Sequence, residues 1–378
     1  MKFPTYIAIL GRQPELGLVE LESRLGAAAV MPWGRYAALL EQELPLEQFG
    51  GVIKTGRVLY RGPAVDIGKV PFDWKSLSPG AGKTTFALSY YGLKGTPRFV
   101  LATGLELKKR LKEHGPVRLV TPTEGTAVGA AALRHNGIPE AGFELLVVIA
   151  QQEMVVAVTT AVQDIDWYSK RDYERPARSA KVGMLPPKLA QVLVNTTHGS
   201  LVVDPFCGTG VVLQEALLLG RTAVGSDLAP EMVAATRANL TWLADEAPRE
   251  LLPWQADEAD ARTVQLPDVD CAVVSEGYLG PNLTASPTPS QLDTIRAELR
   301  GLYRAALANW ARQLDEGAEI ALCVPAWRTK QGWQYLGLVD DLPRLGYTSK
   351  VFKHVRSPLL YARGDQVVGR QLLLLRKN

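Results

Sequence analysis

Short apolar runs alternate with amphipathic stretches along the carboxyl-terminal half of this 378-residue chain. Runs of strand length occur at 201–203, 222–226, 269–275 and 319–324. Stretches with helical spacing separate them, at 211–219, 230–244 and 292–314, and a strand pair at 350–355 and 366–375 closes the pattern. Strands that alternate with helices predict βαβ units, so we expect a doubly wound α/β domain over residues 188–378.

The amino-terminal part, residues 1–163, combines strand-like and helix-like apolar patterns in a different order. Strands are expected at 6–10, 36–40, 84–91 and 117–121, followed by a hairpin of 145–150 with 154–162. Helices are expected at 15–25, near 46–54 and at 104–113. This pattern predicts a separate α+β region, which a linker rich in proline and arginine, residues 164–187, joins to the carboxyl-terminal domain.

Composition narrows the class of protein. Hydrophobic residues make up 47% and charged residues 21% of the chain, as in ordinary globular proteins, and the formal net charge is +3. The three cysteines, Cys207, Cys271 and Cys323, lie far apart, so the sequence predicts neither a disulfide framework nor a cysteine-based metal site. No apolar run resembles a signal peptide or a membrane span. We expect a cytoplasmic protein without a bound metal or membrane contact.

A candidate nucleotide-cofactor site lies between the first two strands of the carboxyl-terminal domain. The apolar run Leu201–Val203 ends at Asp204, a Gly208-Thr209-Gly210 turn follows, and a second apolar run ends at Asp227. In a βαβ unit this order brings both acids to the carboxyl ends of neighbouring strands, where glycines let the backbone pass close to a ligand. Asp227 is then placed to bind the two hydroxyls of a ribose.

The residues of the turn favour one cofactor over another. A dinucleotide fingerprint requires G-x-G-x-x-G, but Leu213 stands where the third glycine is expected, which disfavours NAD. An acid before the turn suits S-adenosylmethionine (SAM), because its methionine end carries an ammonium and a sulfonium. Asp204 would face this cation. The expected cofactor-binding residues are Asp204, Pro205, Phe206, Cys207, Gly208, Thr209, Gly210, Asp227 and Leu228.

Positive charge is concentrated just before this site. From residue 170 to 188, six basic residues face two acids. From charge alone, the simpler interpretation is a solvated linker whose arginines pair with surface acids. Such density beside a cofactor domain also suits contacts to nucleic-acid phosphates, and the candidates are Arg175, Arg178, Lys181 and Lys188.

Residues 171–195, RDYERPARSAKVGMLPPKLAQVLVN, together with DPFCGTG at 204–210, resemble the THUMP-domain RNA methyltransferases, in particular those that form N2-methylguanosine at position 10 of tRNA. The resemblance implies a Rossmann-like class I methyltransferase domain preceded by a ferredoxin-like and THUMP-like region that binds tRNA. It also implies that Met184–Pro187 packs near SAM and that Asp257 contacts the adenine amine.

The resemblance breaks down at the catalytic motif. Where the family has Asp-Pro-Pro-Tyr, this chain has Ser275-Glu276-Gly277-Tyr278. In the usual motif an acceptor oxygen and a proline carbonyl take the two amine hydrogens, while the tyrosine stacks on the flipped-out base. Here Tyr278 is the candidate for stacking, Glu276 is the candidate carboxylate, and Gly277 replaces a rigid proline.

We therefore expect SAM-dependent methylation of the exocyclic N2 amine of a guanosine in tRNA. Because the motif is altered, a catalytically silent RNA-binding protein of the same fold is an alternative, and so is a DNA amino-methyltransferase. The sequence leaves open which nucleotide is modified, how many methyl groups are added, the oligomeric state and the need for a small activator subunit.

Overall fold

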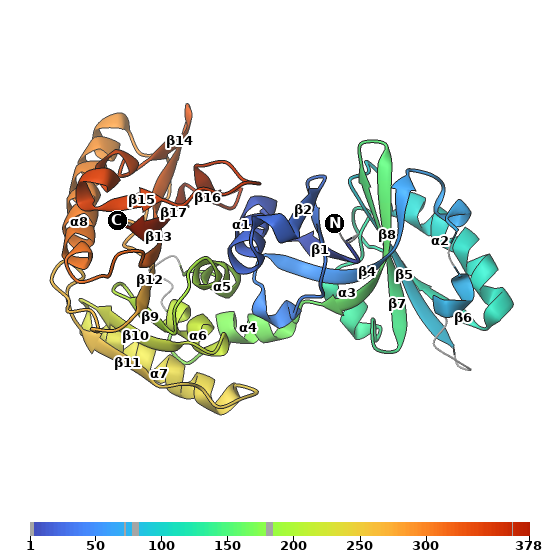
Figure 1. Cartoon of the computed structure of the whole chain (residues 1–378), viewed down its shortest axis with the longest axis horizontal. Coiled ribbons are helices and arrows are strands. Elements are labelled where there is room, and N and C mark those ends of the chain that lie inside the picture. Colours follow the sequence, from blue (N-terminus) through green and yellow to red (C-terminus); the bar gives the residue numbers. More distant parts are fainter. Residues whose placement is uncertain (1–3, 72, 78–82, 179–183, 365) are drawn as a thin grey trace. The chain divides into compact units, whose positions relative to one another are not determined.

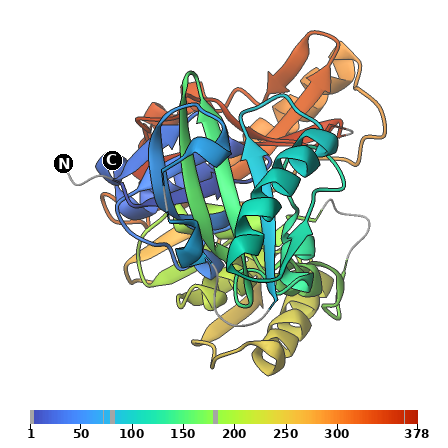
Figure 2. The same ribbon diagram turned by 90° about the vertical axis from the view of Figure 1, so that its right-hand side faces the viewer.

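The computed structural model describes residues 4–71, 73–77, 83–178, 184–364 and 366–378. The chain folds into two compact units, Met1–Asp166 and Trp167–Asn378, here called unit 1 and unit 2 (Figures 1 and 2). Most of the segment 164–187 thus falls in unit 2. None of the described helices is long and apolar enough to cross a membrane.

Unit 1 is built on a mixed sheet. Among its described residues the sheet has eight strands in the order β2-β3-β1-β4-β8-β7-β5-β6. The strands are β1 (Tyr6–Leu10), β2 (Val30–Trp33), β3 (Ala37–Leu40), β4 (Val52–Pro63), β5 (Thr84–Tyr91), β6 (Val117–Val120), β7 (Gly142–Ala150) and β8 (Glu153–Val162). The helices are α1 (Pro14–Leu25), α2 (Pro97–Leu111) and α3 (Ala130–His135). The predicted strands and the hairpin are confirmed, and the helix predicted at 104–113 begins earlier, at a Thr96 N-cap.

Strand β4 joins the two halves of the unit 1 sheet. It pairs antiparallel with β1 on one side and with β8 on the other. Helix α1 packs on β1 and β2, whereas α2 packs on β5 and β6, as Figure 2 shows for α2. The sheet is continuous across the unit because β4 takes part in both halves.

The helix predicted near residues 46–54 was wrong. A short 3-10 turn, Leu46–Gln48, is followed by residues 49–51 and then by β4. The Gly50-Gly51 pair explains the difference, because both of its N–H groups donate to the Glu20 carboxylate of α1, at 2.9 and 2.7 Å. A Cβ on Gly51 would lie 2.6 Å from Gly17 Cα. This close approach to α1 replaces the helical hydrogen bonds.

The interior of unit 1 contains an ion pair. The side chains of Lys54 on β4 and Glu144 on β7 are 1% and 0% exposed, and Lys54 Nζ lies 2.6 Å from Glu144 Oε1. The hydroxyls of Ser89 and Thr159 also donate to the Glu144 carboxylate, and Lys54 donates a second hydrogen bond to Val128 O. Burial lowers the pKa of Lys54, and Glu144 acts against that shift. The network ties four strands to the loop before α3.

Replacing Lys54 by methionine should lower the free energy of unfolding by about 3–5 kcal/mol, because Glu144 is left buried without its counter-ion. Adding Glu144→Gln should recover most of this loss, since the uncharged glutamine keeps an acceptor oxygen for one of the two hydroxyls and its amide can donate to the other. Equilibrium urea denaturation of both variants measures the difference. A double variant as unstable as Lys54→Met would attribute the loss to packing instead.

Unit 2 is a doubly wound α/β domain, as predicted. In the part of unit 2 that is described, nine strands form one sheet with the order β11-β10-β9-β12-β13-β17-β15, with β14 on β13 and β16 on β17. The strands are β9 (Leu201–Asp204), β10 (Thr222–Asp227), β11 (Trp254–Glu258), β12 (Cys271–Glu276), β13 (Glu319–Thr329), β14 (Gly332–Tyr335), β15 (Tyr347–Ser349), β16 (Leu359–Tyr361) and β17 (Val368–Lys377). The helices are α4 (Ile165–Tyr173), which begins at the boundary, α5 (Pro187–Asn195), α6 (Val211–Leu218), α7 (Pro230–Glu246) and α8 (Pro289–Ala311).

The strands β11, β10, β9, β12 and β13 run parallel, and β17 lies antiparallel beside β13. Helix α8 contributes Tyr303 and Trp310 to a core that also contains Val273 of β12. Helices α5 and α6 pack on each other and on β12 (Figure 1). Alternating strands and helices therefore pack around the parallel part of the sheet, as the apolar pattern predicted.

One strand predicted for unit 2 was wrong, and two helices, α4 and α5, were not predicted. Residues 350–355 form no strand, because the short strands β15 and β16 on either side of them already pair with β17. Val351 in this stretch is 93% exposed. Helix α4 lies inside the expected linker, where Tyr168 and Arg171 share one buried face at helical spacing.

Candidate functional site

The polar ends of four neighbouring parallel strands lie in one row at the edge of the unit 2 sheet. The strand order β11-β10-β9-β12 places Asp257, Asp227, Asp204 and the Ser275-Glu276 pair side by side. The strand order reverses between β9 and β12, and open α/β sheets bind ligands outside the carboxyl ends of the strands at such a point. The structure thus brings the predicted cofactor acids next to the predicted catalytic motif.

The turn between β9 and α6 is held by backbone hydrogen bonds. Cys207 N donates to Ser226 O at 2.9 Å, and Gly210 N donates to Cys207 O at 2.7 Å. Gly208 and Gly210 have φ values of +52° and +83°, in the left-handed region that favours glycine. A Cβ on Gly210 would also lie 3.0 Å from the Thr236 side chain. The turn therefore depends on both glycines.

Asp227 organises this turn through its side chain. Its Oδ2 accepts a hydrogen bond from Gly208 N at 2.9 Å, and its Oδ1 accepts one from Ala229 N at 3.0 Å. Each carboxylate oxygen has two lone pairs, so capacity remains for hydroxyl donors. The next residue, Leu228, is 64% exposed and offers an apolar surface beside the acid. On the other side of the turn, Asn239 Nδ2 donates to Thr209 O at 2.8 Å.

Asp204 is buried at the end of β9. Its side chain accepts hydrogen bonds from Ser275 Oγ at 2.6 Å and from Phe206 N at 3.1 Å, across the buried Pro205. Burial raises the pKa of Asp204 to about 8, although both hydrogen bonds act in the opposite direction. A cation beside this carboxyl would favour its ionised form, so the site would bind a cation in preference to a neutral or anionic group.

The altered motif spans the end of β12 and the start of the loop that follows it. Glu276 forms a buried ion pair with Arg370 Nε of β17, and the side chains are 15% and 3% exposed. Burial raises the pKa of Glu276, and Arg370 counteracts the shift. Tyr278 is 53% exposed, so its ring is accessible for stacking. Its backbone oxygen accepts a hydrogen bond from the Tyr303 hydroxyl at 2.8 Å.

The packing of Tyr303 explains why glycine replaces proline at residue 277. A Cβ on Gly277 would lie 2.8 Å from Tyr303 Cζ and closer still to its hydroxyl. Such contacts are shorter than real Cβ atoms make, so any larger residue at 277 requires Tyr303 to move. The glycine therefore makes room for a tyrosine that binds the same loop.

Asp257 reaches the row from β11. Its carboxylate pairs with Arg237 of α7 at 3.0 Å, and the two side chains are 50% and 56% exposed. Arg237 also donates to Ala256 O. An exposed pair of this kind contributes little to stability, so Asp257 is held in place without being sequestered.

The basic candidates differ in their surroundings. Arg175 is 2% exposed and donates to Met184 Sδ at 3.2 Å. Its side chain is therefore packed inside the unit and is not accessible to solvent. Arg178 is exposed and stacks over the Tyr173 ring at 5.2 Å. Lys188 lies 4.9 Å from the centre of the Tyr168 ring, and its pKa is lowered, chiefly by burial. Lys181 lies outside the described residues.

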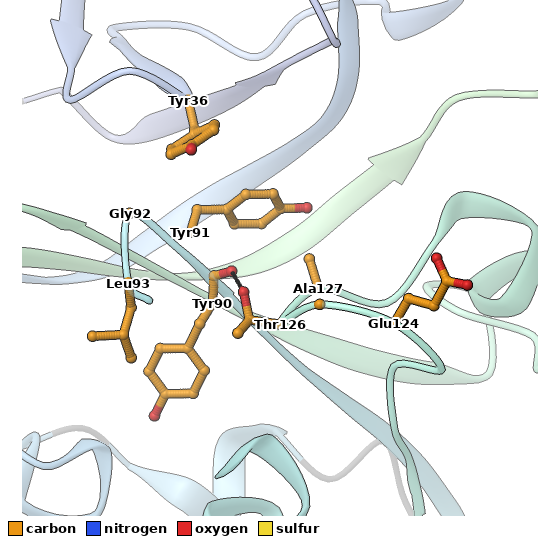
Figure 3. A pocket seen from close by; sticks show the side chains of 9 residues that line it. Tyr36, Tyr90, Tyr91, Gly92, Leu93, Glu124, Thr126 and Ala127 are labelled. Atoms are coloured by element: carbon orange, nitrogen blue, oxygen red, sulfur yellow. Dashed lines mark hydrogen bonds between the residues drawn. The ribbon is translucent and has the colours of Figure 1, made fainter. Parts of the chain in front are cut away.

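Unit 1 contains a hollow that sequence reasoning did not find (Figure 3). It has a volume of about 280 Å³ and is lined by Tyr36, Tyr90, Tyr91, Gly92, Leu93, Glu124, Gly125, Thr126 and Ala127. The rings of Tyr36 and Tyr91 lie near each other, with centroids 6.5 Å apart. Tyr36 is 42% exposed, and Arg35 and Lys94 next to the lining residues are exposed as well.

Comparison with known proteins relates these features to methyltransferases. A sequence model of the family described as "DNA methylase" matches residues 161–238. Two curated relatives are named "tRNA (guanine(10)-N2)-dimethyltransferase". The one from Methanothermobacter thermautotrophicus is 33% identical over 38% of this chain and 39% of its own length. The one from Methanocaldococcus jannaschii is 34% identical over 25% of this chain and 27% of its own length. The match therefore spans two fifths or less of these relatives.

Solved structures match along nearly the whole chain. TrmN from Thermus thermophilus covers 99% of this chain and 99% of its own, with a TM-score of 0.56 and 19% identity. SMU.472 in complex with SAH covers 100% of this chain and 99% of its own, with a TM-score of 0.52 and 12% identity. The chain has a Rossmann-like methyltransferase fold. At these identities the likeness establishes the α/β architecture alone.

Asp204→Asn should stabilise the protein above neutral pH when no ligand is bound. The folded-state pKa of Asp204, about 8, lies above its usual value of about 3.9, so its ionisation costs stability progressively as pH rises between these values. Asparagine keeps an acceptor oxygen for Ser275 and Phe206 but cannot ionise. Thermal unfolding from pH 5 to pH 9 should therefore show a steeper loss for the wild type than for the variant. Parallel curves would contradict this account.

Proposed function

We propose that this protein is a SAM-dependent RNA methyltransferase that methylates the exocyclic N2 amine of a guanosine in tRNA. The observation that carries the proposal is the row of strand ends, in which three acids and the Ser275–Tyr278 loop lie at the point where the strand order reverses. The relatives named tRNA (guanine(10)-N2)-dimethyltransferase support the choice of substrate.

The residues of this row fit SAM. The buried Asp204 carboxyl would hold the ammonium of the methionine end, and Asp227 would accept hydrogen bonds from the ribose hydroxyls. The exposed Leu228 would contact the adenine ring, and Asp257 would accept from its amine. When bound, SAM supplies a methyl group that is activated by its positively charged sulfur. Gly208 leaves the space beside it open, because a Cβ there would meet only Phe206 O, at 4.0 Å.

The loop after β12 would present the base. The amine of guanine is a weak nucleophile because its lone pair is delocalised into the ring, so catalysis depends on alignment and on acceptors for its hydrogens. Glu276 would accept one hydrogen, and the exposed Tyr278 would stack on the flipped-out base. The Tyr303 hydroxyl, by holding Tyr278 O, would keep the loop in position.

Binding of tRNA would use both units. Arg178 and Lys188 would contact phosphates beside the site, with Lys181 between them in the sequence. In unit 1 the tyrosine-lined hollow would take an unpaired base, because Tyr36 and Tyr91 offer ring faces and the neighbouring Arg35 and Lys94 offer charge.

A DNA amino-methyltransferase is the second candidate, since the family model that matches residues 161–238 is described as a DNA methylase. The tyrosine-lined hollow favours a substrate with unpaired bases over duplex DNA. A silent RNA-binding protein is the third, because the Arg370 pair already engages the Glu276 carboxylate.

Incubation with labelled SAM and either a tRNA pool or duplex DNA, followed by mass spectrometry of the nucleosides, separates the three. We expect N2-methylated guanosine from tRNA alone. Asp227→Ala should abolish transfer and weaken SAM binding in calorimetry, since it removes both the ribose acceptor and the bond to Gly208 N. The exposed Asp293→Ala of α8 is the matched control and should change neither. A methylated product on DNA alone would favour the second candidate. The absence of product on both tRNA and DNA would favour the third.

Tyr36→Ala and Arg178→Ala should each weaken tRNA binding without changing SAM affinity. Loss of a stacking ring costs about 1–3 kcal/mol per base. Loss of a phosphate contact lowers the slope of log K against log salt by about one, so only Arg178→Ala should flatten the salt dependence. Fluorescence anisotropy at several salt concentrations measures both effects, with the exposed Arg249→Ala as control. If Arg178→Ala and Arg249→Ala gave identical slopes, Arg178 would have no phosphate contact.

A further inference from the structure

Arg370 occupies an unusual position relative to the altered motif. It comes from β17, which pairs with β13, and β13 in turn pairs with β12. Its side chain is 3% exposed, and Nε donates to Glu276 Oε1. Its Nη2 donates to Met184 O at 3.4 Å, and its guanidinium lies 5.9 Å from the Tyr361 ring centre. One side chain therefore binds the loop after β12 and the segment before α5.

The charges around Glu276 make this contact important. The titratable groups that face it are Asp204 from β9, Tyr303 from α8 and Cys323 from β13, besides Arg370. Among them Arg370 supplies the positive charge. Burial raises the pKa of Glu276, and Arg370 opposes that shift. Without Arg370, burial would act unopposed and the carboxyl would be protonated at higher pH.

The protonation state decides what Glu276 can do for an amine. A carboxylate only accepts hydrogen bonds and has about four lone-pair sites, so one hydrogen bond from Arg370 leaves sites for an amine hydrogen. A protonated carboxyl directs a hydrogen outward from one oxygen and loses part of this capacity. The hydrogen bond to Arg370 also sets the direction in which the remaining lone pairs point.

We propose that Arg370 is the positioning residue of the altered motif, which holds Glu276 as an oriented acceptor for the substrate amine. The proposal rests on the methyltransferase function proposed above. Arg370 stands 94 residues after Glu276, and it would compensate for the missing rigid proline at residue 277.

Single-turnover methylation of tRNA as a function of pH tests the proposal in Arg370→Gln, Arg370→Lys, Glu276→Gln and the Arg370→Gln, Glu276→Gln double variant. The Arg370→Gln variant should methylate tRNA slowly at neutral pH and faster as the pH rises. At a pH below the pKa of Glu276, each unit by which this pKa increases lowers the ionised fraction of Glu276 about tenfold. Arg370→Lys should keep the wild-type profile in large part. The double variant should be no slower than Glu276→Gln, since Arg370 acts through Glu276.

Arg376→Gln is the matched control, because Arg376 lies on the same strand and pairs with Glu319, at the other end of β13. It should leave rate and pH profile unchanged. If Arg370→Gln fails to fold, Arg370→Lys and the charge-neutral double variant still carry the test. An unshifted pH profile for Arg370→Gln, or losses that multiply in the double variant, would overturn the proposal. A wild type that transfers no methyl group to tRNA while binding SAM would instead overturn the proposed function.

Discussion

The hydrogen bond from Ser275 Oγ to Asp204 is the contact on which the candidate site depends. It joins the ends of β9 and β12, the two strands between which the sheet reverses its order. Asp204 also fixes the start of the following turn through Phe206 N. A buried carboxyl thus connects the residues that would hold the cofactor with the loop that would hold the base, and neither can shift without disturbing the other.

Buried ion pairs hold the surrounding segments in place. Arg171 of α4 pairs with Glu215 of α6 at 2.8 Å, with both side chains nearly inaccessible, and so attaches the basic segment to the helix that follows the cofactor turn. Arg370 does the same for the loop after β12. Separating either pair would leave a charge in a medium of low polarity, which is far more costly than losing a surface pair. Such pairs add little net stability, but they select one arrangement of the chain.

Local patterns carried much of the prediction. The turn from Asp204 to Gly210 and the acid at Asp227 could be predicted because the glycines and acids that form this part of the fold lie close together in the sequence. The helix expected near 46–54 failed because a partner in α1, Glu20, decides the structure there. Arg370 had no sequence signal, since its partner is distant in the chain and the two meet only across the sheet. Arg175 was singled out by its charge, whereas its burial follows from packing.

The fit between Gly277 and Tyr303 constrains how the loop after β12 can change. The tyrosine fills the space in which a side chain at residue 277 would begin. A proline at that position would meet Tyr303 and would also lack the N–H that Gly277 donates to Cys323 O at 3.0 Å. A smaller residue at 303 would relieve only the first conflict, and that change removes the hydroxyl that holds Tyr278 O. The glycine at 277 and the tyrosine at 303 therefore depend on each other, and exchanging either one alone would leave the loop crowded or unsupported.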